Sequence, residues 1–88
     1  MIRTRKALVA ACLLLSASTS RRLTPDERED LERFCFIVSE GIPDLPISSY
    51  ALRDFADKVR QTGLIEHGHA ADVSDLLKHA ESLTLLFP

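Results

Sequence analysis

From residue 25 onward, apolar residues recur three and four positions apart, which is the spacing of one face of an α-helix. Three segments carry such a stripe, and none shows the alternation that is typical of a half-buried strand. The stripes are Leu31, Phe34, Cys35 and Val38; Ala51, Leu52, Phe55, Ala56 and Val59; and Val73, Leu76, Leu77, Ala80, Leu83 and Phe87. This pattern predicts an all-α fold with helices at about 25–40, 49–62 and 70–86.

Polar residues and helix breakers at the ends of these segments support the three helices. Thr24 and Glu27 have the spacing of a capping box, in which each side chain accepts a hydrogen bond from the other residue's backbone N–H. A connector at 41–47 contains one glycine and two prolines, which are expected to stop the first helix. Gly63 is expected to end the second helix, and Asp72 is suited to cap the third.

The first 20 residues follow a different pattern, which is typical of a secretory signal. Three cations lie in the first six residues, nine apolar residues follow at 7–15, and residues 16–20 are all small. Cleavage is expected after Ser18 or Ser20. The expected product is a small three-helix bundle, or an open three-helix array, formed by residues 21–88 and located in the periplasm or outside the cell.

Other interpretations of the same segment stay open. Residues 1–23 are rich in Arg and Ser and contain no acid, as in a mitochondrial presequence, although their apolar run is not amphipathic. The sequence Val9-Ala10-Ala11-Cys12 is similar to a bacterial lipobox. An uncleaved first core helix is the remaining alternative. A membrane anchor is excluded because it needs roughly 20 apolar residues.

The charge distribution makes nucleic acid and lipid unexpected partners. All 13 acidic residues lie at or after Asp26, so residues 21–88 carry eight positive and 13 negative charges, a formal net charge of −5. Such a surface repels phosphate backbones, and no local basic patch offsets the repulsion. The polar helix faces also lack the Lys and Arg enrichment of membrane-surface helices. No stable membrane anchor is therefore expected after cleavage.

Four apolar residues lie beside the predicted stripes and are candidates for binding a partner. Phe36 and Ile37 widen the apolar surface of the first predicted helix, and Leu85 and Leu86 do the same near the C-terminus. They belong either to a broad buried face of a compact bundle or to a surface that an unidentified protein or a second copy completes.

The densest cluster of potential metal ligands surrounds the start of the third predicted helix. His67 and His69 lie before that helix, and His79 shares its polar face with Asp72 and Asp75. Imidazole and carboxylate groups bind zinc and copper. Their spacing matches no established metal motif, and a polar loop followed by a solvated helix face is the competing interpretation.

No motif predicts catalysis or a cofactor. Cys35 would be the only cysteine after cleavage, which excludes a disulfide scaffold. A buried core position is expected for Cys35, with an intermolecular disulfide as the alternative. Ser48-Ser49-Tyr50 lacks the Gly-x-Ser-x-Gly setting of a nucleophile and is interpreted as a helix cap. We therefore do not expect an enzyme.

Together these patterns predict a small exported acidic protein that acts by protein–protein interaction. An inhibitor, an immunity-type factor, an adaptor or a virulence accessory would fit this description. One alternative is a metal-binding protein that uses His67, His69 and His79. Another is a secreted peptide precursor, for which Arg21-Arg22 would be a dibasic processing site.

Overall fold

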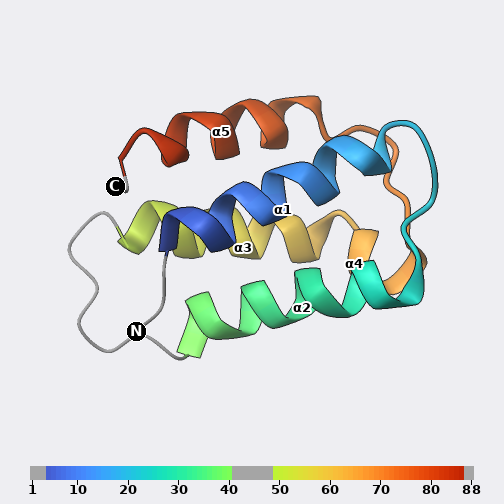
Figure 1. Cartoon of the computed structure of the whole chain (residues 1–88), viewed down its shortest axis with the longest axis horizontal. Coiled ribbons are helices and arrows are strands. Elements are labelled where there is room, and N and C mark those ends of the chain that lie inside the picture. Colours follow the sequence, from blue (N-terminus) through green and yellow to red (C-terminus); the bar gives the residue numbers. More distant parts are fainter. Residues whose placement is uncertain (1–3, 41–48, 87–88) are drawn as a thin grey trace.

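The computed structural model describes residues 4–40 and 49–86, and the regular elements within these ranges are all α-helices (Figure 1). The helices are α1 (Thr4–Ser18), α2 (Pro25–Glu40), α3 (Ser49–Gln61), α4 (Leu64–His67) and α5 (Ser74–Thr84). The all-α class that the apolar spacing predicts is confirmed. The connector at 41–47, Ser48 and Phe87 lie outside the described residues.

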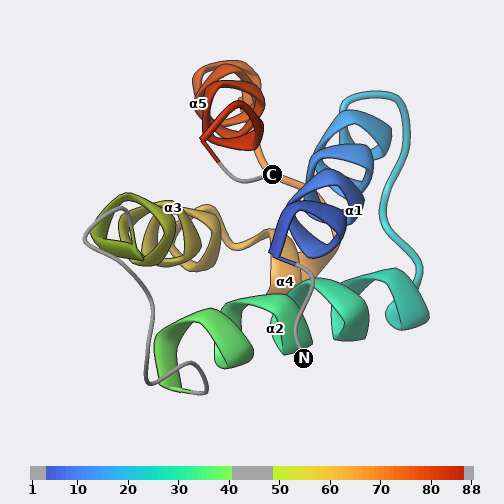
Figure 2. The ribbon, with the colours of Figure 1, turned by 60° about the vertical axis from the view of Figure 1, so that its left-hand side comes forward.

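The four longer helices surround one shared interior (Figure 2). α1 packs against α5 and α2, and α3 packs against the same two helices. α4 is a single turn that contacts α2 and α3. Each long helix therefore has two long neighbours, and α1 lies across the interior from α3.

Residues of α1 belong to the same hydrophobic core as the predicted stripes. Leu8, Ala11 and Leu15 are at most 1% exposed and lie in one cluster with the apolar residues of α2, α3 and α5. The prediction of three helices is therefore wrong in its count for this structure. It fails because the apolar run at 7–15 forms a core helix, and because the four residues of α4 are too few to show a helical stripe.

α2 begins with the predicted capping box. The backbone N–H of Glu27 donates to Thr24 Oγ1 at 3.2 Å, and the backbone N–H of Thr24 donates to Glu27 Oε1 at 2.9 Å. These bonds satisfy donors that a helix start leaves without an intrahelical acceptor. The predicted range of 25–40 for this helix is confirmed.

The two later boundaries agree with the sequence pattern to different extents. Gly63 has a φ of 78°, the left-handed conformation that ends α3 as predicted. α5 begins at Ser74 and ends at Thr84, so the predicted range of 70–86 is too long at both ends. Asp72 Oδ1 accepts hydrogen bonds from the Ser74 N–H at 2.9 Å and the Ser74 hydroxyl at 2.8 Å. This turn forms ahead of the helix and delays its start.

The segment between α1 and α2 is fastened to the C-terminal end of α4. The last carbonyl groups of a helix have no intrahelical donor, and here backbone and arginine N–H groups supply the donors. The bonds run from Leu23 N to Gly68 O at 2.7 Å, from Arg22 Nη1 to His67 O at 2.9 Å, from Arg28 Nε to Ile65 O at 2.7 Å, and from Arg28 Nη2 to Glu66 O. They fix the position at which α2 begins relative to α4.

Candidate protein-binding groove

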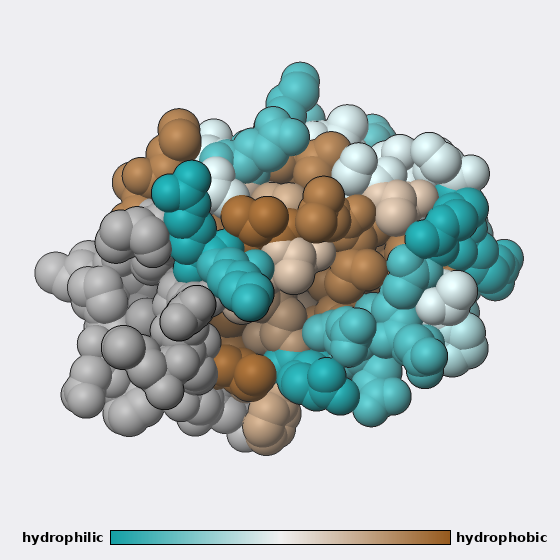
Figure 3. Space-filling view, viewed as in Figure 1, coloured by the Kyte–Doolittle hydropathy of each residue, from teal (hydrophilic) through white to brown (hydrophobic). Residues whose placement is uncertain are grey.

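An apolar groove with a volume of about 570 Å³ lies between α1 and α2. Its apolar lining comes from Ala7, Ala10, Ala11, Leu13, Leu14 and Ala17 of α1 and from Phe34 and Ile37 of α2. Figure 3 shows an apolar area across the middle of this face, with hydrophilic residues along its edge. The groove therefore has an apolar floor and a polar border.

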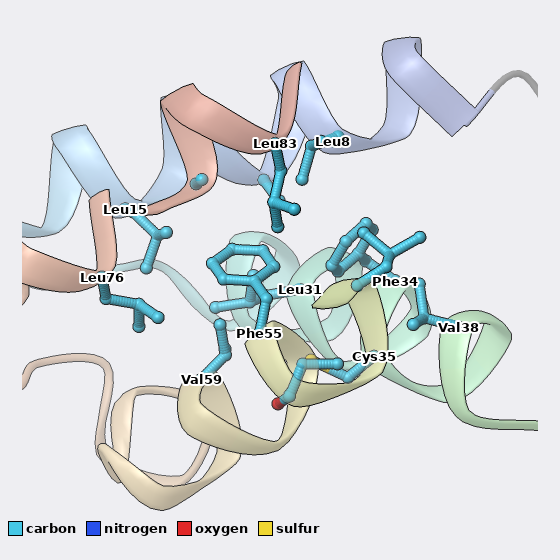
Figure 4. Close-up of a cluster of buried hydrophobic side chains, with 14 of the residues drawn as sticks. Leu8, Leu15, Leu31, Phe34, Cys35, Val38, Phe55, Val59, Leu76 and Leu83 are labelled. Atoms are coloured by element: carbon cyan, nitrogen blue, oxygen red, sulfur yellow. The ribbon is translucent and has the colours of Figure 1, made fainter. Parts of the chain in front are cut away.

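The groove exists because α1 is apolar on two sides. Leu8 and Leu15 point into the core (Figure 4), whereas Val9 and Leu13 are 40% and 66% exposed on the outer side. Between them, the small side chain of Ala10 leaves space next to α2. A helix that is apolar all round is normally covered on every side. The outer side of α1 is thus an apolar surface without a cover among the described residues.

Charged residues at the border are held in ion pairs. Arg21 donates to both carboxylate oxygens of Glu27, at 2.6 and 2.7 Å. Arg33 lies 3.2 Å from Asp30 and 3.3 Å from Glu29. The hydrogen bond from Arg21, followed by that from the Thr24 backbone, lowers the pKa of Glu27 to about 2. These carboxylates are therefore already engaged with arginines of the same chain.

Of the four residues predicted to bind a partner, only Ile37 lines this groove. Phe36 is 54% exposed on α2, and Leu85 and Leu86 are exposed beyond the end of α5. The alternative that all four complete a broad buried face is wrong for Phe36, Leu85 and Leu86. The sequence reasoning missed Leu13 and its neighbours because it assigned their segment to a leader.

The structure does not bring the three histidines together. Among the described residues, no group of three or more His, Cys, Asp or Glu side chains is arranged to hold a metal ion. His67 and His69 are exposed, and the Nε2 of His67 lies 3.7 Å from Glu66. His79 instead packs its ring against Phe55, with the ring centroids 6.2 Å apart. The cluster that the sequence suggested is thus divided between surface and core.

Cys35 is a core residue, as the sequence predicts. Its side chain is fully buried, and Sγ lies 3.7 Å from the backbone oxygen of Ala56. Burial raises the pKa of the Cys35 thiol to about 11. A thiol in this state is a poor nucleophile, and an intermolecular disulfide would require the surrounding helices to separate.

Comparisons with known proteins identify no family. Among the described residues, none of the helices combines the length and apolar character needed to cross a membrane. No family model matches this chain, and neither a curated protein nor a solved structure matches it.

Proposed function

We propose that this protein acts by binding another protein molecule in the groove between α1 and α2. The observation that carries the proposal is the exposed apolar side of α1, where Leu13 stands 66% exposed beside an apolar floor. Contiguous exposed apolar surface bordered by polar residues is typical of interaction sites. A helix with apolar residues at three- and four-residue spacing would cover this groove.

The polar groups of the groove favour a protein over a small molecule. Small-molecule sites usually orient their ligand with a few convergent polar groups. Here the charged groups at the border are paired with one another, as in Arg21 with Glu27 and Arg33 with Asp30. What remains for an occupant is shape and apolar area, which a partner helix supplies well.

The proposal concerns the chain with α1 retained. Export to the periplasm or medium, with cleavage after Ser18 or Ser20, stays a competing prediction for the same residues. Cleavage there would remove Leu8, Ala11 and Leu15 from the core and one wall of the groove. The intact mass of the protein recovered from its own cells or medium distinguishes the two, because cleavage removes 18 or 20 residues.

A site-specific photocrosslinker tests the proposed groove. We expect a photoreactive residue at position 13 to give a discrete covalent adduct with another protein molecule in the native cell. The same residue at Lys78, on the exposed side of α5, is the matched control and should give none. Ala10→Glu, which places a charge in the groove, should suppress the adduct. An equal adduct pattern from positions 13 and 78 would contradict the proposal.

A further inference from the structure

We propose that the occupant of this groove is a second copy of the chain, with the two α1 helices packed antiparallel. The inference rests on the proposed function, since it uses the same groove. Its starting point is a stripe on the outer side of α1. Lys6, Ala10, Leu13 and Ala17 follow one another at intervals of four, three and four residues. This is the spacing of a seam between two packed helices.

The seam is self-complementary when α1 meets itself in the opposite direction. With a two-fold axis midway between Ala10 and Leu13, each Leu13 lies opposite the other copy's Ala10. Lys6 then lies opposite Ala17 by the same counting. The protruding leucine of each copy thus meets the small residue that opens the groove of the other. An interface in which each copy presents the same patch is the usual form of a symmetric dimer.

Charge supports the same antiparallel direction. Thr4–Ser18 contains two cations, Arg5 and Lys6, and no acid. In the antiparallel arrangement these cations reach the end of the groove where Glu27 and Asp30 form the border. Residues 26–30 hold four acids and one arginine, and that arginine is engaged with the carbonyls of α4. The basic end of one α1 therefore meets an acidic border on the other copy.

These features favour a second copy over an unrelated helix. The groove offers a small-residue recess for one large apolar side chain and an acidic border beyond it. A second copy carries both complements, Leu13 and Lys6, seven residues apart on one helical stripe. A partner helix that is acidic at that end would be repelled by Asp30.

Sedimentation equilibrium of the full-length chain tests the dimer. We expect a concentration-dependent shift from monomer to dimer mass. Leu13→Asp should raise the dissociation constant roughly tenfold or more, because it places a carboxylate in the apolar seam. Ser82→Asp adds the same charge on the exposed side of α5 and should leave the constant unchanged. Circular dichroism establishes that each variant is folded, and Leu13→Ala, which should weaken the dimer to a smaller extent, replaces Leu13→Asp if that variant unfolds.

A charge exchange tests the antiparallel direction. Lys6→Glu and Asp30→Lys should each raise the dissociation constant about threefold. The double variant should return most of the lost affinity, because the two charges then attract again. Two losses that simply add would overturn the antiparallel arrangement.

The remaining outcomes separate this inference from the proposed function. A chain that is monomeric at every concentration, while position 13 crosslinks to a different protein, would overturn the dimer and leave the groove as a binding site. A monomer with no adduct from position 13 would overturn both. A dimer that persists in Leu13→Asp would overturn the inference and indicate contacts elsewhere, such as Leu85 and Leu86.

Discussion

Arg21 and Glu27 form a two-bond ion pair that closes one end of the groove, with Nη1 to Oε1 at 2.6 Å and Nη2 to Oε2 at 2.7 Å. Glu27 also accepts the backbone N–H of Thr24, so one carboxylate holds both the chain before α2 and the first turn of the helix. Each of these donors favours the ionised carboxylate, and the pKa of Glu27 is lowered to about 2 as a result.

The pair predicts a specific acid sensitivity. In the unfolded chain Glu27 loses these donors, and its pKa returns to its ordinary value of 4.5. Because the folded pKa is the lower one, Glu27 stabilises the fold fully above pH 4.5, and this contribution is lost as the pH falls towards 2. We expect Glu27→Gln to flatten the pH dependence of the free energy of unfolding in this window, measured by urea denaturation.

Glu29→Gln is the matched control for this experiment. The carboxylate of Glu29 has one 3.3 Å contact with Arg33 and is mostly exposed. Its replacement should leave the wild-type slope between pH 2 and 4.5 almost unchanged. A Glu27→Gln variant that keeps the full wild-type slope would show that the ion pair with Arg21 is not maintained in solution.

Gly68 is predicted to tolerate substitution worse than Gly63. Both have positive φ angles, of 79° and 78°. A Cβ at Gly68 would lie 2.8 Å from Arg22 Cγ and 2.9 Å from the backbone oxygen of Leu23, whereas at Gly63 the nearest atom is His67 Cδ2 at 3.3 Å. The left-handed conformation alone costs an alanine about 1–2 kcal/mol.

We therefore expect Gly63→Ala to lower the free energy of unfolding by about 1–2 kcal/mol. Gly68→Ala should lower it by roughly 1 kcal/mol more, because backbone at Leu23 must move and its hydrogen bond to Gly68 weakens. Urea denaturation of both variants checks the order. Equal losses would indicate that the Leu23–Gly68 contact is absent in solution.

Local signals determine which parts of this fold could be predicted. The start of α2 follows from Thr24 and Glu27, and the end of α3 follows from Gly63, because each signal acts within a few residues. The start of α5 was misplaced because the preceding segment follows Gly68, whose carbonyl is held by the distant Leu23. No local pattern reports that contact.

The position of α1 was not predictable for a different reason. Leu8 and Leu13 differ completely in burial, yet they lie within one apolar run that shows no polar face. Such a run satisfies the requirements of a leader and of a core helix equally, since both need apolar side chains. The groove was missed with it, because it exists only where α1 packs beside α2.

His79 is predicted to reduce the stability of the fold. Its Nε2 is buried and has no hydrogen-bond partner among the described residues, and its ring contacts Phe55. A buried polar atom without a partner costs about 1–3 kcal/mol. We expect His79→Leu to raise the free energy of unfolding by roughly 1 kcal/mol. The exposed His69 is the control, and His69→Leu should change stability by less than about 0.5 kcal/mol.

Leu15 and Leu13 provide the sharpest test of whether α1 belongs to the working protein. Leu15 is completely buried and Leu13 is 66% exposed, although both are leucines of the same helix. Leu15→Ala removes side-chain contacts from the core and should lower the free energy of unfolding by about 2–5 kcal/mol. Leu13→Ala leaves the core intact and should lower the monomer's stability by less than about 0.5 kcal/mol.

Because dimer formation would add a concentration-dependent term, the two variants should be compared by urea denaturation at the lowest practical protein concentration. A large loss for Leu15→Ala beside a small one for Leu13→Ala would establish α1 as a core helix of the retained chain. If a peptidase instead removes residues 1–20, protein purified from the native source would lack both leucines. The two substitutions would then leave the stability of that product identical to wild type, and the groove between α1 and α2 would not exist in it.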